Sequence, residues 1–194
     1  MTDSAKADLH RYLQAGRNAI LWKLDGLSEY DKRRPMTPTG TNLLGIVKHL
    51  TAVELGYFGW TFDREFSGDV PWALEDAEIN SDMWARPEES SEYVVGLYKQ
   101  IWAHSDDTIA DLSLDAEGVV PHWPQERAQV TLHRILVHVI ADMDRHAGHA
   151  DIVRELIDGS TGLTLGNENM APGGEGYWQS YRATVENAAR HFLP

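Results

Sequence analysis

Apolar residues recur at three- and four-residue spacing in several long stretches, which is the pattern of helices that lay one apolar stripe on a core. The clearest stretch runs from Thr131 to Asp158 and is closed by Gly159. Its stripe consists of Leu132, Ile135, Val139, Ala150, Val153 and Ile157. Because successive helical residues turn by about 100°, Asp142 and His146 fall inside that stripe. We therefore predict that this helix points a carboxylate and an imidazole toward the core.

The same periodicity predicts three further long helices. The first covers about Asp3–Leu27, the second about Thr41–Glu65, and the third about Glu88–Leu112 with Pro87 at its start. A short helix over about Tyr177–Phe192 ends the chain. The connections are predicted at 28–40, 66–87, 113–129 and 160–176, where proline and glycine interrupt the pattern.

Four long helices with two long connections predict an all-α fold, a four-helix bundle with crossover loops. Strands are not expected, although the run 117–121 could pair locally. At 194 residues and 42% apolar content the chain is long enough for one sizeable core. We expect a single domain over residues 1–194.

Charge and hydropathy exclude some classes of partner. The formal net charge is −13, and the 17 lysines and arginines are scattered along the chain, so no basic patch for nucleic acid or an anionic membrane is expected. No apolar run approaches the roughly 18 residues that span a bilayer, and the first residues are polar. We expect a cytoplasmic protein.

The chain contains no cysteine. Disulfides, thiolate metal sites and a thiol nucleophile on this chain are therefore excluded. Any thiol chemistry has to come from a small molecule.

A third candidate side chain, His49, lies at the edge of the stripe of the second helix, where Gly45 and Gly56 leave room beside it. A carboxylate on a core face, such as Asp142, needs a cation or a dense hydrogen-bond network. Two imidazoles and a carboxylate across a gap form a metal site with positions left for water or substrate, which is a catalytic geometry. The spacing alone leaves an ordinary polar pair of Asp142 and His146 equally open.

Three segments carry a resemblance to a known family. They are residues 41–54, the Trp-Pro pair at 123 and 124, and residues 140–154 with the run His-Ala-Gly-His-Ala-Asp-Ile. They resemble the DinB-like superfamily, most closely its DUF664 branch, over nearly the whole chain. The resemblance implies a down-up-up-down four-helix bundle, commonly a homodimer, with a divalent metal between helices two and four. It places the ligands at His49, residue 142 and His146.

Position 142 departs from the family pattern, because an aspartate replaces the more usual histidine. A carboxylate there is similar to the metal-binding N-terminal domain of mycothiol-dependent maleylpyruvate isomerase, which has the longer glutamate. If Asp142 falls short, His149 is the substitute ligand; otherwise His149 orients a ligand. We predict a structural role for His138. Isomerase activity on maleylpyruvate is not expected, because that enzyme has an additional C-terminal domain and no room for one is expected before Pro194.

The resemblance implies a metal-dependent transferase or isomerase that uses a low-molecular-weight thiol such as mycothiol, with zinc or nickel as the metal. Arg145 and Arg127 are the candidates for binding an acidic cofactor or substrate, and Tyr57, Trp60 and Trp123 for lining the pocket. Two alternatives stay open. One is a metal-binding or stress-response bundle without turnover, and the other is a bundle without metal, in which Asp142 pairs with a protonated histidine.

Overall fold

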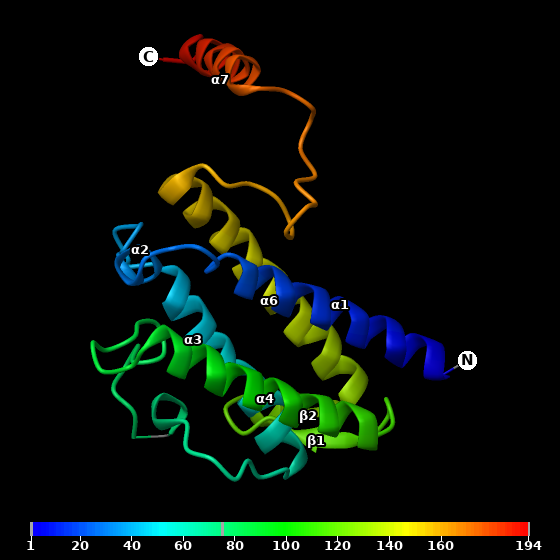
Figure 1. Ribbon diagram of the computed structural model, residues 1–194. Helices are drawn as coiled ribbons and strands as arrows, with labels where there is room; N and C mark the ends of the chain where they lie inside the picture. Colours follow the sequence, from blue (N-terminus) through cyan, green and yellow to red (C-terminus); the bar gives the residue numbers. More distant parts are fainter. Residues whose placement is uncertain (1, 75, 194) are drawn as a thin grey trace.

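The computed structural model describes residues 2–74 and 76–193, and helices make up most of it (Figure 1). The α-helices are α1 (Thr2–Trp22), α2 (Glu29–Arg33), α3 (Leu43–Glu54), α4 (Ser91–Asp111), α5 (Gln125–Ala128), α6 (Leu132–Asp158) and α7 (Glu175–Arg190). The other elements are a π-helical turn η1 (Leu55–Gly59), 3-10 turns η2 (Trp60–Phe62) and η3 (Pro71–Ala73), and strands β1 (Glu117–Val119) and β2 (Gln129–Thr131). The predicted all-α fold is confirmed.

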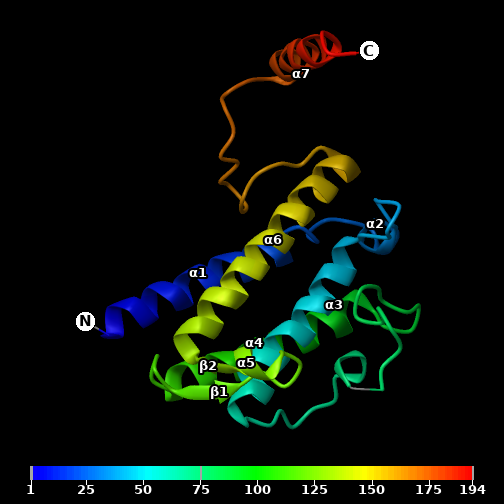
Figure 2. The same cartoon turned by 180° about the vertical axis from the view of Figure 1, so that it is seen from behind.

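The four long helices α1, α3, α4 and α6 form the bundle. Helix α1 packs on α6, and α3 packs on both α4 and α6. Figures 1 and 2 show that α3 and α4 run in one direction and α1 and α6 in the other. Two helices that run the same way cannot be joined by a short turn, so the long connection between α3 and α4 follows from this topology.

Apolar side chains from all four helices fill the core. The fully buried ones include Leu13, Ile20, Leu44, Val47, Leu50, Val94, Tyr98, Leu136, Val139 and Met143. Polar side chains fix where three of these helices begin, because they accept hydrogen bonds from otherwise unpaired backbone N–H groups. Asn42 accepts from Gly45, Ser90 from Tyr93, and Thr131 from Arg134.

Several helix ends differ from the predicted ones. Helix α1 ends at Trp22 rather than Leu27, because the chain turns there and Gly26 adopts a left-handed φ of 73°. Helix α4 begins after Ser90 rather than at Glu88, since the serine hydroxyl caps it and Pro87 does not. Helix α3 gives way to the turns η1 and η2 before the predicted end at Glu65.

Two predicted loops contain regular structure. The segment 28–40 holds α2, which Ser28 caps by accepting a hydrogen bond from Asp31. The run at 117–119, left open by the sequence, is strand β1, and it pairs antiparallel with β2 in the register Glu117 to Thr131 and Val119 to Gln129. The pairing had no local signal because β2 is only three residues long and leads directly into α6.

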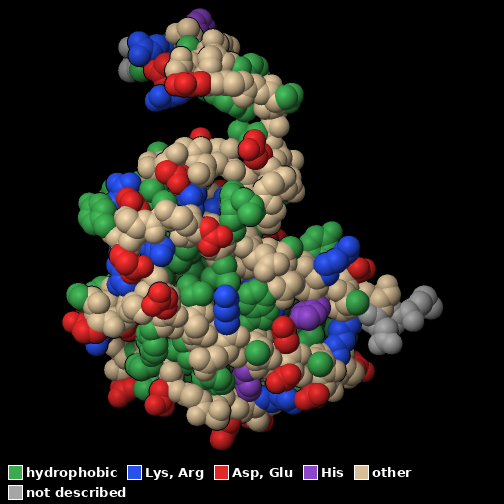
Figure 3. Space-filling view, viewed as in Figure 1, with side chains coloured by type: hydrophobic (Ala, Val, Ile, Leu, Met, Phe, Trp, Pro, Cys, Tyr) green, Lys and Arg blue, Asp and Glu red, His purple; other side chains and the backbone are tan. Residues whose placement is uncertain are grey.

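Helix α7 lies apart from the bundle, beyond the C-terminal end of α6 (Figures 1 and 3). Most of its side chains are exposed. On the face drawn in Figure 3, basic and acidic side chains are interspersed rather than gathered into one basic area. Within the described residues, no helix combines the length and the apolar character that crossing a membrane needs. A single domain over residues 1–194 stays a prediction.

A charged network lies inside the bundle. Arg17 of α1 and Glu54 of α3 are both fully buried and paired, with Arg17 Nε 2.9 Å from Glu54 Oε1. Arg17 also donates to Asp106 of α4 at 2.7 Å, and the Tyr98 hydroxyl of α4 donates to Glu54 at 3.2 Å. The network therefore joins α1, α3 and α4 at one point in the core.

We predict that Arg17→Met lowers the free energy of unfolding by about 3–5 kcal/mol, because it leaves the Glu54 carboxylate buried without its cation. The double variant Arg17→Met, Glu54→Gln should recover most of this loss, since its amide can still accept from Tyr98. Urea unfolding followed by circular dichroism measures both. A single variant within about 1 kcal/mol of wild type would contradict the assignment.

Candidate metal centre

Three candidate ligands come together where α3 faces α6. His49 lies on α3, and Asp142 and His146 lie one turn apart on α6. One ligand atom from each residue can be chosen so that all three lie within 4.8 Å of one another. His146 Nε2 is 3.8 Å from Asp142 Oδ1, and the ring centroids of His49 and His146 are 4.8 Å apart. Helix packing thus gathers residues that are about 95 positions apart in the sequence.

Asp142 is less buried than the periodicity predicted. Its side chain is 31% exposed, whereas the neighbouring Met143 is fully buried. The core-facing stripe of α6 therefore passes through Val139 and Met143, and Asp142 lies beside it at the rim. The expectation of a buried carboxylate that demands a cation was wrong, since water reaches Asp142 and reduces the cost of its charge.

His49 has a partner in the connection between α3 and α4. Its Nδ1 lies 2.7 Å from Asp82 Oδ2. The hydrogen bond from His49 holds the pKa of Asp82 below its usual range, so the aspartate is ionised and the imidazole is the donor. This leaves His49 Nε2 as the nitrogen free to bind a metal. Asp82 was missed by the sequence analysis because the 66–87 connection has no periodicity that would direct it anywhere.

Gly45 holds the Asp82 loop against α3. A Cβ at Gly45 would lie 2.0 Å from the carbonyl oxygen of Met83, so only a residue without a side chain allows this contact. Asn42 Nδ2 donates to the same oxygen at 3.1 Å. The sequence analysis assigned the space at Gly45 to the site beside His49. The backbone of Met83 fills it instead, and this contact sets Asp82 next to His49.

The three side chains fit a divalent metal. Burial, together with the neighbouring His49, lowers the pKa of His146, which favours the neutral imidazole that binds metals. Two ligands about 2.1 Å from a tetrahedral ion lie about 3.4 Å apart, close to the separation of His146 and Asp142. Among the side chains of residues 4–74 and 76–193, this is the one group of three or more His, Asp or Glu residues with ligand atoms near enough to share an ion.

A cavity of about 370 Å³ opens beside the three candidate ligands. Its lining consists of His49, Ala52, Val53, Gly56, Tyr57, Trp60, Asp82, His122, His138 and Asp142. Tyr57 and Trp60 line it as predicted, and Trp123 donates a hydrogen bond to the Tyr57 hydroxyl at 3.2 Å. His138, for which we predicted a structural role, points at this cavity from α6. His122 was not singled out by the sequence, and its place between two prolines was the available signal.

The remaining predicted residues, His149, Arg127 and Arg145, do not line this cavity. His149 is solvent-exposed, and its ring centroid is 5.6 Å from that of His146. Arg127 is exposed on α5, with its guanidinium 5.8 Å from the centre of the Trp123 ring. Arg145 is exposed on α6 next to His146. The roles predicted for the two arginines stay predictions.

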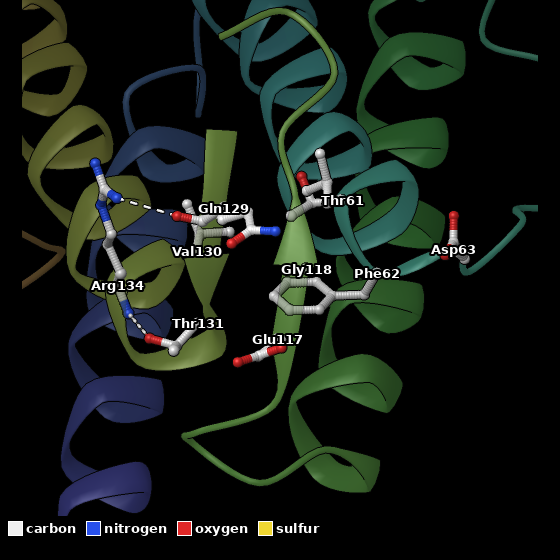
Figure 4. A pocket seen from close by; sticks show the side chains of 10 residues that line it. Thr61, Phe62, Asp63, Glu117, Gly118, Gln129, Val130, Thr131 and Arg134 are labelled. Atoms are coloured by element: carbon white, nitrogen blue, oxygen red, sulfur yellow. Dashed lines mark hydrogen bonds between the residues drawn. The ribbon is translucent and has the colours of Figure 1, made fainter. Parts of the chain in front are cut away.

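A different cavity, of about 470 Å³, lies between η2 and the β1–β2 hairpin (Figure 4). Arg134 is engaged there with the backbone carbonyl of Gln129, and its own N–H donates to the Thr131 hydroxyl. Asp63 lies at the edge, away from the other polar side chains in the view. Among the residues drawn, no set of titratable side chains converges there. The cavity beside His49 is therefore the better candidate for a functional site.

Comparison with known proteins assigns the chain to a family. The family model described as mycothiol-S-transferase matches residues 8–159, which is most of the chain and includes all three candidate ligands. The match ends at Gly159, the C-cap of α6, and does not include α7. A search of curated proteins gives no match.

We predict that Gly45→Ala lowers the free energy of unfolding by about 1–3 kcal/mol, because the added methyl group overlaps the Met83 carbonyl. Gly96→Ala on α4 is the matched control, since a Cβ there meets nothing within 4 Å and should stabilise the helix by about 0.5–1 kcal/mol. Chemical denaturation of both variants measures the difference. Equal stability of the two variants would show that the loop does not rest on Gly45.

Proposed function

Because this chain belongs to the mycothiol-S-transferase family, we propose that it is a metal-dependent transferase that joins a low-molecular-weight thiol, mycothiol, to an electrophile. The observation that carries the proposal is the convergence of His49, Asp142 and His146 beside a cavity. The absence of cysteine supports it as well, because the nucleophilic sulfur then has to come from a small molecule.

His49, Asp142 and His146 would hold the ion. A divalent metal bound there supplies Lewis acidity that lowers the pKa of a thiol, so that thiolate is present at neutral pH. The chain's own residues prepare the site. Asp82 fixes the tautomer and direction of His49, burial keeps His146 neutral, and the exposed edge of Asp142 leaves an open approach from the cavity.

Further features of the proposal come from the family resemblance. We propose zinc or nickel as the metal, since two imidazoles and a carboxylate suit both, and a homodimer as the assembly. Arg127 and Arg145 would contact acidic groups of the thiol cofactor or the substrate. Arg127 is the better placed, because its guanidinium packs over Trp123, whose indole N–H reaches into the cavity wall.

We predict about one divalent metal per chain in the purified protein and a loss of most of it in His49→Ala or His146→Ala, since either change removes one of three protein ligands. His133→Ala is the matched control, an exposed histidine on the same helix outside the site. Metal content by inductively coupled plasma mass spectrometry decides the outcome. An unchanged metal content in both His49→Ala and His146→Ala would show that these residues do not bind the metal. A wild-type protein without metal would favour the alternative in which Asp142 pairs with a protonated histidine.

Metal content also decides whether Asp142 or His149 is the third protein ligand. Asp142→Ala should lower metal content, whereas His149→Ala should leave it near the wild-type level. Asp82→Asn keeps all three ligands and should weaken metal affinity by about 10–100-fold, because His49 loses the carboxylate that orients it. The reverse order of Asp142 and His149 would assign the ligand to His149.

We predict that the metal-loaded protein transfers mycothiol to 1-chloro-2,4-dinitrobenzene, and that His146→Ala lowers this rate by at least about 100-fold. Absorbance of the thioether product reports the rate, and His133→Ala serves again as the control. A wild-type protein that binds metal but shows no transfer would support the non-catalytic metal-binding alternative.

A further inference from the structure

A cluster of four polar aromatic side chains lies at the same cavity, and three of them, Tyr57, His122 and His138, line it. At its centre is the Tyr57 hydroxyl, which has Trp123 Nε1 at 3.2 Å, His138 Nε2 at 3.0 Å and His122 Nε2 at 3.4 Å. These four residues come from η1, the 120–124 loop and α6. Two separate parts of the chain, the 120–124 loop and α6, therefore direct nitrogen atoms at the hydroxyl that η1 carries, and none of these groups is a candidate metal ligand.

Counting donors shows where the Tyr57 proton can go. Trp123 Nε1 is a donor only, so it occupies one acceptor position of the hydroxyl oxygen. Burial lowers the pKa of His138, so its ring is neutral and carries one proton. With that proton on Nε2, His138 is a second donor, and the oxygen then accepts two N–H groups. In this tautomer, on which the proposal below depends, the Tyr57 hydrogen points along the third direction, toward His122 Nε2.

His122 is the partner that a ligand can replace. It is exposed, and its contact of 3.4 Å is the longest of the three, whereas Tyr57, Trp123 and His138 are half-buried. A ligand oxygen that enters the cavity can take its place and accept the Tyr57 hydrogen. Burial also raises the pKa of Tyr57, against the opposing effect of the Trp123 hydrogen bond, so the hydroxyl keeps its proton at neutral pH.

We propose that Tyr57 is the hydrogen-bond donor for the electrophile, with Trp123 and His138 as its positioning residues, and that the preferred substrates are electrophiles whose leaving atom is an oxygen, as in an epoxide. This inference rests on the proposed thiol transfer and adds the substrate class. The lining of the cavity includes His49 and Asp142 as well as Tyr57, His122 and His138, so two of the candidate ligands and the Tyr57 hydroxyl border the same space.

The atoms balance as follows. The thiolate sulfur attacks one epoxide carbon and forms the S–C bond, while the C–O bond to that carbon breaks and its electron pair passes to oxygen. The oxygen takes the proton of Tyr57 Oη, whose negative charge the N–H groups of Trp123 and His138 stabilise. Water then returns a proton to Tyr57, which balances the proton that the thiol lost to solvent. The product is a β-hydroxy thioether.

The test compares two electrophiles on the metal-loaded protein. Styrene oxide needs its oxygen protonated, whereas 1-chloro-2,4-dinitrobenzene releases chloride, which needs no proton. In Tyr57→Phe the ratio of the styrene oxide rate to the chloride-releasing rate should fall by about 100-fold, the usual effect of removing one donor to a developing oxyanion. Trp123→Phe should lower the same ratio by a smaller factor, about tenfold. Tyr12→Phe, an exposed tyrosine on α1, is the matched control and should leave both rates unchanged.

Binding gives a readout that does not depend on turnover. Titration calorimetry with the β-hydroxy thioether of mycothiol and styrene oxide should show about tenfold weaker binding to Tyr57→Phe. The matching thioether without the hydroxyl group should bind the variant and the wild type equally.

The outcomes separate this inference from the function on which it rests. Wild-type transfer to the aryl chloride together with an unchanged ratio in Tyr57→Phe overturns the role of Tyr57 alone, and so does equal weakening of both thioethers. Wild-type transfer to the aryl chloride but not to styrene oxide overturns the substrate class. Absence of transfer to either electrophile overturns the proposed function and this inference with it.

Discussion

The buried pair of Arg17 and Glu54 is the constraint on which the arrangement of the bundle depends. A carboxylate with no exposed surface is tolerated only next to a cation, so α1 and α3 can pack only where these two groups meet. Asp106 and Tyr98 extend the same requirement to α4. Glu54 is the last residue of α3, directly before the π-helical turn that carries Tyr57 and a little more than one turn after His49. Fixing Glu54 in the core therefore also fixes the two ends of the cavity wall that α3 and η1 provide.

The cavity is built from rigid helices on one side and loops held in place on the other. The helices carry His49, Asp142 and His146, whose separations follow from helix packing, and of these His49 and Asp142 line the cavity. The loops contribute the groups that orient these side chains, and each loop is held by a specific contact. Met83 rests on Gly45, and another buried cation, Lys48, binds Glu89 at 2.7 Å just before α4. Apart from Asp82, which bonds His49 directly, the 66–90 connection therefore acts on the site by holding that aspartate in position.

The two clusters of polar side chains at the cavity differ in whether they present lone pairs or hydrogen-bond donors. His49, Asp142 and His146 present nitrogen and oxygen lone pairs that suit a cation. Tyr57, Trp123 and His138 present N–H and O–H groups that suit a developing negative charge on oxygen. A transferase that joins a thiolate to an electrophile needs both kinds of group in one space. The proposed function and the proposed role of Tyr57 rest on this division, and the proposed function agrees with the family whose model matches residues 8–159.

The sequence by itself determined the long helices, because periodicity is a local property that one stretch of chain carries within itself, and the family resemblance named the candidate ligands on them. Helix α6 was predicted almost to the residue: the predicted stretch was 131–158 closed by Gly159, and the helix is Leu132–Asp158 with Thr131 as its N-cap. The tertiary structure alone decided how deeply each side chain lies. Asp142 is at the rim rather than in the core, and Arg17, Glu54 and Lys48 are buried although their residue types predict exposure. Asp82 and His122 reach the site from segments without periodicity. Their positions depend on contacts between distant parts of the chain, such as Met83 on Gly45, and no local pattern encodes these contacts.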